Sequence, residues 1–176
     1  VTVQDTFLKD NETHFMNHYV LDYNSELASN FFPQSKEVIR FYEKYFGDYQ
    51  WYEDGYKLIE VPYLGMEHQS AVTYGNGFSM YNGVRSKSWP MYGVMDPLII
   101  HETGHEWFGN SVTASDPTHI WIHEGLQVYS EAIYFEDKFG SYEVGVHYLN
   151  SIKDRIVNEI PIVGNENENH WALHGD

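Results

Sequence analysis

His101-Glu102-Thr103-Gly104-His105, with Glu124 after eighteen intervening residues, is the stretch that sets the fold class and the chemistry of this sequence. On a helix, residues four apart lie about 40° from each other, so His101 and His105 project from one face and can share a metal ion. Glu124 would complete a set of two imidazoles and one carboxylate, which leaves a fourth position for water. Glu102 flanks that face, within reach of such a water. The pattern therefore predicts a catalytic zinc site with a general base.

The alternative for this stretch is an ordinary amphipathic helix with two solvated histidines. The sequence holds ten histidines, so the motif on its own can arise by chance. However, it follows an apolar run over residues 94–100 and precedes Trp107-Phe108. Polar groups in such a setting need partners, and a metal ion would supply one.

Composition indicates a globular protein and disfavours several kinds of partner and site. The 176 residues suffice for one domain with a core, and 42% hydrophobic residues indicate a globular chain. The formal net charge of −16 disfavours nucleic acid and anionic membrane surfaces, because both attract basic proteins. The absence of cysteine excludes disulfides and thiolate metal sites. No apolar run approaches the ~18 residues of a membrane span, and no signal peptide is visible.

Residue patterns predict strands first and helices afterwards. Strands are expected as a pair within 1–23 around a polar turn at 9–12, then over 56–61, 69–74 and 78–81. Helices are expected over 35–46, 96–108, 119 or 122–139, and 141–159, with Ser25 as a helix N-cap and 164–176 irregular. This order indicates an α+β fold, in which a small mixed sheet is followed by helices and the metal-bearing helix packs against the sheet.

Two further features lie near the predicted site. Glu131 follows Glu124 by seven residues, about two helical turns, and so faces nearly the same way. It is a candidate to orient a zinc-bound imidazole, and a surface glutamate is an equally weighted alternative. Met66-Glu67 lies between two predicted strands, where an exposed edge could align an extended peptide through main-chain hydrogen bonds.

Together these motifs resemble those of the zinc aminopeptidases of the aminopeptidase N and leukotriene hydrolase type, which are thermolysin-like gluzincins. That family carries HExxH, eighteen residues and Glu, and a Gly-x-Met-Glu-Asn loop about thirty residues upstream. Leu64-Gly65-Met66-Glu67-His68 occupies the place of that loop, with Leu64 and His68 as departures. The resemblance covers roughly residues 24–176.

The resemblance implies a thermolysin-like catalytic domain over 24–176, preceded at 1–23 by strands from the end of an N-terminal β-domain. It implies one Zn²⁺ per chain, held by His101, His105 and Glu124, with Glu102 as base and then proton donor. Glu67 would bind the free α-amine of a peptide substrate, and Gly65 and Met66 would line the substrate strand and its first pocket. Hydrolysis would therefore be limited to the N-terminal peptide bond.

The family also uses a tyrosine before a Lys-Gly pair to stabilise the oxyanion, and no Tyr-x-Lys-Gly segment is present here. The chain begins at Val1 and ends at Asp176, which is expected for a piece that is incomplete at its C-terminal end. We expect such a piece to bind zinc without its main oxyanion donor. The parent protein would add a helical C-terminal domain and most of the N-terminal β-domain.

Two other functions are compatible with a zinc motif. One is a different zinc hydrolase, either a thermolysin-type endopeptidase or an epoxide-hydrolysing relative. Glu67 disfavours an endopeptidase, because a carboxylate there would clash with a continuing peptide chain. The other is a non-catalytic, zinc-containing peptide-binding domain. Glu102 disfavours that function, because a structural zinc site needs no general base.

Overall fold

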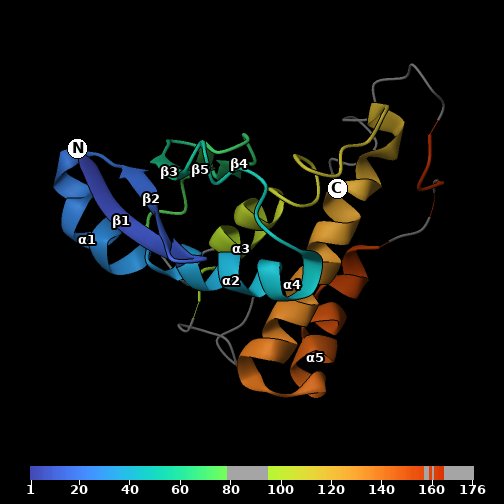
Figure 1. Ribbon diagram of the computed structural model, residues 1–176. Coiled ribbons are helices and arrows are strands. Elements are labelled where there is room, and N and C mark those ends of the chain that lie inside the picture. The colour runs from blue at the N-terminus through green and yellow to red at the C-terminus, as the bar shows by residue number, and fades with distance from the viewer. Residues whose placement is uncertain (79–94, 157–158, 160, 165–176) are drawn as a thin grey trace.

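The computed structural model describes residues 1–78, 95–156, 159 and 161–164, and contains one mixed sheet with helices against it (Figure 1). The five strands are β1 (Thr2–Lys9), β2 (Glu12–Tyr19), β3 (Tyr56–Glu60), β4 (Gly65–Met66) and β5 (Val72–Tyr74). Their order in the sheet is β1-β2-β3-β5-β4. β2, β3 and β5 run parallel, while β1 and β4 pair antiparallel to their neighbours. The predicted small mixed sheet is confirmed.

The N-terminal hairpin forms as predicted. Asp10 and Asn11 both have positive φ, 50° and 66°, which is the backbone of the tight turn that matches the twist of paired strands. Phe7 and Met16 point from the hairpin into the core. β2 is hydrogen-bonded to β3, so the sheet is continuous across residue 23. The assignment of residues 1–23 to a preceding β-domain stays a prediction.

Five α-helices are described: α1 (Ser25–Phe31), α2 (Gln34–Phe46), α3 (Pro97–Gly104), α4 (Glu124–Phe139) and α5 (Tyr142–Ile152). Short 3₁₀ turns add η1 (Asp22–Asn24), η2 (Pro117–Ile122) and η3 (Lys153–Arg155). α2 and α4 end at Gly47 and Gly140, as predicted, and Gly140 adopts the left-handed backbone that terminates helices. Within the described residues, no helix is long and apolar enough to cross a membrane.

Several predicted boundaries were wrong. Ser25 is the first residue of α1, and Asn24 occupies its N-cap. α3 ends at Gly104 and not near Phe108, because hydrogen bonds from Glu106 N to Thr103 O and from Trp107 N to Gly104 O tighten the chain into turns. α5 ends at Ile152 and tightens into η3, and β5 begins only at Val72. Most of the strand expected over 78–81 and of the irregular segment 164–176 lies outside the described residues.

α3 lies at the centre of the molecule, between the sheet and the helices α2 and α4, while α5 packs along α4 (Figure 1). The absence of a side chain at Gly104 permits this packing. A Cβ atom there would lie 2.1 Å from the Tyr42 hydroxyl and 2.3 Å from Gln127 Oε1. Those two side chains are hydrogen-bonded to each other at 2.7 Å, from α4 to α2. Gly104 therefore lets three helices meet at one point.

Asp96 starts α3 as predicted. Its side chain accepts the N–H of Leu98 at 2.9 Å, and Pro97 occupies the first helical position, where a missing N–H costs nothing. The same carboxylate is fully buried and accepts hydrogen bonds from the Tyr74 hydroxyl at 2.6 Å and the Asn76 amide at 3.1 Å. Asp96 thus ties the helix that carries the motif to the end of β5.

We expect Asp96→Ala to destabilise the protein by at least about 2 kcal/mol in urea unfolding. Loss of the cap costs about 1 kcal/mol, and loss of the acceptor from buried polar partners adds about 1–3 kcal/mol. Asp96→Asn is the matched control, because its amide oxygen still caps the helix, and it should lose clearly less. Equal stability of Asp96→Ala and wild type would contradict this role.

Candidate metal centre

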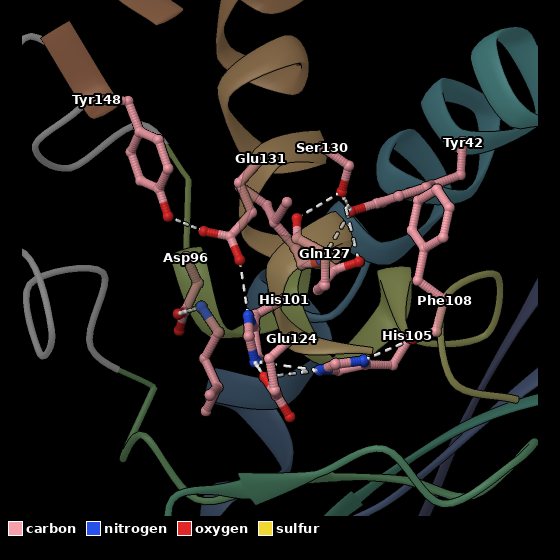
Figure 2. A network of polar contacts seen from close by, with 12 residues as sticks. Tyr42, Asp96, His101, His105, Phe108, Glu124, Gln127, Ser130, Glu131 and Tyr148 are labelled. Carbon is pink, nitrogen blue, oxygen red and sulfur yellow. Dashed lines mark hydrogen bonds and ion pairs between the residues drawn. The ribbon is translucent and has the colours of Figure 1, made fainter. Parts of the chain in front are cut away.

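Three potential metal donors converge where α3 meets the start of α4. His101 lies in α3, His105 follows at its C-cap, and Glu124 is the first residue of α4. The two Nε2 atoms are 3.2 Å apart, and Glu124 Oε2 lies 3.5 Å from that of His101 and 3.6 Å from that of His105 (Figure 2). Ligands of a tetrahedral zinc ion at 2.0–2.2 Å lie about 3.3–3.6 Å apart. The donor triangle fits zinc.

Each imidazole is oriented through its other nitrogen. His101 Nδ1 lies 2.6 Å from Glu131 Oε1, and His105 Nδ1 lies 2.8 Å from the Phe108 carbonyl oxygen (Figure 2). Both acceptors require a proton on Nδ1, which leaves the Nε2 lone pairs directed into the cluster. Glu131 is only 4% exposed, so the alternative of a surface glutamate does not apply. Nothing in the sequence predicts that the Phe108 carbonyl orients His105.

The electrostatics of the cluster favour a cation. Without a metal ion, burial opposes the charge on Glu124, but the adjacent imidazoles of His101 and His105 hold the pKa of its carboxyl far below the ordinary value. Burial likewise opposes a charge on His101, yet Glu124 and Glu131 hold the pKa of its imidazole well above the usual range. The carboxylates thus stabilise positive charge at this position, which a divalent metal ion would supply.

Glu102 lies beside the donor triangle, on the side toward the sheet. It is 7% exposed, and burial raises the pKa of its carboxyl to about 7, against the opposing charges of His101 and His105. A carboxyl group with a pKa near neutrality can both accept and release a proton during a reaction. Its position therefore suits a general base and acid.

The upstream motif, Gly65-Met66-Glu67, approaches the donor triangle from the sheet. Gly65 and Met66 form β4 and not a loop, and they pair with β5 at the edge of the sheet. Carboxylate oxygens of Glu67 and Glu102 and a ring nitrogen of His105 all lie within 4.8 Å of one another. The Glu67 carbonyl also accepts a hydrogen bond from Asn110 at 2.9 Å, which fixes the end of β4.

The two departures from the family loop do not disturb this arrangement. The Leu64 and His68 side chains are exposed. Their carbonyl oxygens accept backbone hydrogen bonds, Leu64 from Gly75 at 2.7 Å and His68 from Ala71 at 2.9 Å. Because the backbone makes these contacts, the identity of either side chain has little effect on them.

Another histidine lies near the cluster. The Nε2 atom of His123 accepts the N–H of Ala114 at 2.9 Å. This bond ties the loop after α3 to the residue before Glu124. Burial and the nearby His105 lower the pKa of the His123 imidazole, while the charges of Glu67 and Glu124 oppose this shift.

Comparisons with known proteins identify the family. Residues 31–165 match the family described as "Peptidase family M1 domain". The chain belongs to peptidase family M1. Endoplasmic reticulum aminopeptidase 2 from Homo sapiens is 32% identical over 136 residues, which are 73% of this chain and 14% of that protein. Probable aminopeptidase 1 from Sulfurisphaera tokodaii is 26% identical over 118 residues, or 65% of this chain and 15% of that protein.

Solved structures of the M1 family share the fold. An M1 zinc metallopeptidase from Deinococcus radiodurans, bound to a Tyr-Ser-Ala substrate, aligns with a TM-score of 0.62 at 15% identity. The alignment covers 94% of this chain and 35% of that structure. The α+β fold of an M1 zinc peptidase is thereby confirmed. This chain spans about a seventh of the length of the curated relatives named above.

The donor triangle predicts binding of one zinc ion per chain. Replacement of His105 by Ala removes one ligand, and we expect zinc affinity to fall by more than about 100-fold, the upper end of losses for outer-shell changes. His147→Ala is the matched control, because His147 is exposed on α5, and its affinity should equal wild type. Chelator competition followed by metal analysis measures both. Equal affinity in the two variants would contradict the site.

Gly65 in β4 lies directly against the side chain of Glu102. A Cβ atom at Gly65 would lie 2.6 Å from Glu102 Oε1, so Gly65→Ala must displace the carboxylate. Because that atom ends a flexible side chain, the fold and zinc affinity should persist. Peptide hydrolysis by the natural full-length protein should fall by roughly 10²-fold, the effect of misplacing a catalytic group by about 1 Å. An unchanged rate would show that Gly65 does not position Glu102.

Proposed function

We propose that this chain is the catalytic part of a zinc aminopeptidase, which removes the N-terminal residue from peptides. His101, His105 and Glu124 would hold the zinc ion, and Glu102 would act as general base. The observation that supports this function best is the convergence of Glu67 and Glu102 on His105. The carboxylate proposed to bind the amine and the one proposed to transfer the proton would thus act beside the same metal ligand. The relatives from Homo sapiens and Sulfurisphaera tokodaii are both named aminopeptidases.

Glu102 would carry the proton transfers of the reaction. When bound, zinc polarises the scissile carbonyl and acidifies its water. Glu102 takes a proton from the attacking water and later donates it to the leaving amine. Before a metal ion binds, burial raises the pKa of the Glu102 carboxyl to about 7, so both of its forms are accessible near neutrality. Gly65 leaves room for the carboxylate beside β4.

Glu67 would select the end of the chain. In an N-terminal residue, the α-nitrogen and the carbonyl carbon are both bonded to Cα, so they lie only about 2.5 Å apart. A group that binds the amine must therefore lie within a few ångströms of the groups that act on the carbonyl. Glu67 and Glu102 meet that condition. A charge-assisted contact between the α-ammonium and Glu67 would favour substrates with a free N-terminus.

β4 would align the substrate backbone. It is the last strand in the sheet order and pairs only with β5 among the described strands. An edge of this kind can bind an extended peptide through main-chain hydrogen bonds. Gly65 and Met66 lie along this edge directly before Glu67, so a peptide aligned there would present its N-terminus to the carboxylate.

Comparison of a free aminoacyl anilide with its acetylated form tests the function in the natural full-length protein. Acetylation removes the ammonium charge, so we expect kcat/KM to fall by at least about 10- to 100-fold, the value of a charged hydrogen bond. Chelation of zinc should abolish hydrolysis of both. Equal rates on both substrates would reject an aminopeptidase, and no hydrolysis of either by the zinc-loaded protein would favour a non-catalytic domain.

Two variants separate the proposed roles. Glu67→Gln keeps the shape and removes the charge, so it should erase the preference for the free amine while zinc affinity stays unchanged. Glu102→Gln should lower kcat on both substrates by about 10²–10⁴-fold, the contribution of a general base. If Glu67→Gln retained the preference of wild type, another residue would bind the amine.

A further inference from the structure

Glu131 is a buried carboxylate that is held at both oxygens. Oε1 lies 2.6 Å from His101 Nδ1, and Oε2 accepts a hydrogen bond from the hydroxyl of Tyr148 in α5. Tyr148 is 7% exposed and its ring packs on Phe135. Figure 2 shows tyrosine, carboxylate and imidazole in one continuous line toward the donor cluster. A contact from α5 thus leads directly to a metal ligand.

We propose that Tyr148 is a positioning residue for the zinc site, which acts through Glu131 on the orientation of His101. This inference rests on the zinc site of the proposed function and adds a third helix to it. Because both oxygens of Glu131 have a partner, its carboxylate is held in one orientation. The His101 imidazole that donates to this carboxylate is then held in one orientation as well. Without the tyrosine hydroxyl, the one hydrogen-bond partner left to the Glu131 carboxylate among the described residues is the ring that it must orient.

The two histidines differ in how they are supported, and this difference explains why His101 needs Tyr148. His105 donates to the backbone carbonyl of Phe108, which belongs to a turn held by its own hydrogen bonds. His101 donates to the end of a side chain with several rotatable bonds. A side-chain acceptor orients a ligand only if the acceptor is itself oriented. Tyr148 supplies that restraint.

The packing of α5 against α4 brings the hydroxyl within reach. A Cβ atom at Gly145 would lie 2.8 Å from the carbonyl oxygen of Ala132 in α4. Glycine therefore permits the two helices to approach closely at this point. Tyr148 follows Gly145 by three residues and lies on the same face of α5, next to Glu131, which neighbours Ala132. The close approach and the hydrogen bond are thus parts of one contact.

Zinc affinity of the protein, measured by competition with a chelator, tests the proposal with Tyr148→Phe. This variant removes only the hydroxyl, and we expect affinity to fall about tenfold, the lower end of losses at outer-shell partners. Tyr134→Phe is the matched control. Tyr134 is also buried, and its hydroxyl donates to the carboxylate of Glu37 in α2 at 3.2 Å and not to Glu131. The control should stay within about twofold of wild type.

The Glu131→Ala background shows whether Tyr148 acts through Glu131. Tyr148→Phe should then change affinity by less than about twofold, because the two effects share one path. Thermal unfolding of the metal-free variants verifies that all are folded.

Several results would overturn the proposal. An unchanged or increased affinity of Tyr148→Phe contradicts it, as does an equal loss in Tyr134→Phe. If wild type binds zinc normally, these results remove only the role of Tyr148. If wild type itself binds no zinc, the proposed function fails, and this inference fails with it.

Discussion

The packing of α4 against α3 is the constraint on which the site depends. α4 carries both Glu124, a proposed metal donor, and Glu131, which lies 2.6 Å from His101 Nδ1 and two turns further along the helix. One helix placement therefore sets a ligand and the support of another ligand at the same time. Gly104 permits that placement, because a larger residue would displace the contact between Tyr42 and Gln127. Packing and metal geometry are thus coupled in this fold.

The sheet contributes the second half of the site. β4 pairs at the edge of the sheet and ends beside α3, so Glu67 arrives next to Glu102 and His105 although they are far apart in sequence. Asp96 connects α3 to the end of β5, which neighbours β4. The donors of the metal and the proposed amine-binding carboxylate therefore depend on one packed unit of α3, α4 and the sheet edge.

Local features could be predicted from the sequence, whereas features made by distant contacts could not. Residue type predicts the N-cap at Asp96 and the end of α4 at Gly140. Helical spacing predicts that His101 and His105 share one face. The early end of α3 depends on turns after Gly104 that no period in the sequence indicates. The roles of the Phe108 carbonyl and of Tyr148 could not be predicted from the sequence. Every residue has a backbone carbonyl, and nothing distinguishes Tyr148 from the other tyrosines among the fifteen in the sequence. The closeness of Gly65 to Glu102 likewise appears only when β4 and α3 are placed together.

Anomalous diffraction at the zinc edge from crystals of the zinc-loaded protein would show directly which residues bind the metal ion. We expect one peak about 2.0–2.2 Å from His101 Nε2, His105 Nε2 and a Glu124 oxygen, as tetrahedral zinc requires. Glu131 should remain bonded to His101 Nδ1. A peak held instead by Glu67, Glu102 and His105, the other donor group of the described residues, would contradict the assigned roles. No peak at either group would contradict the zinc site itself.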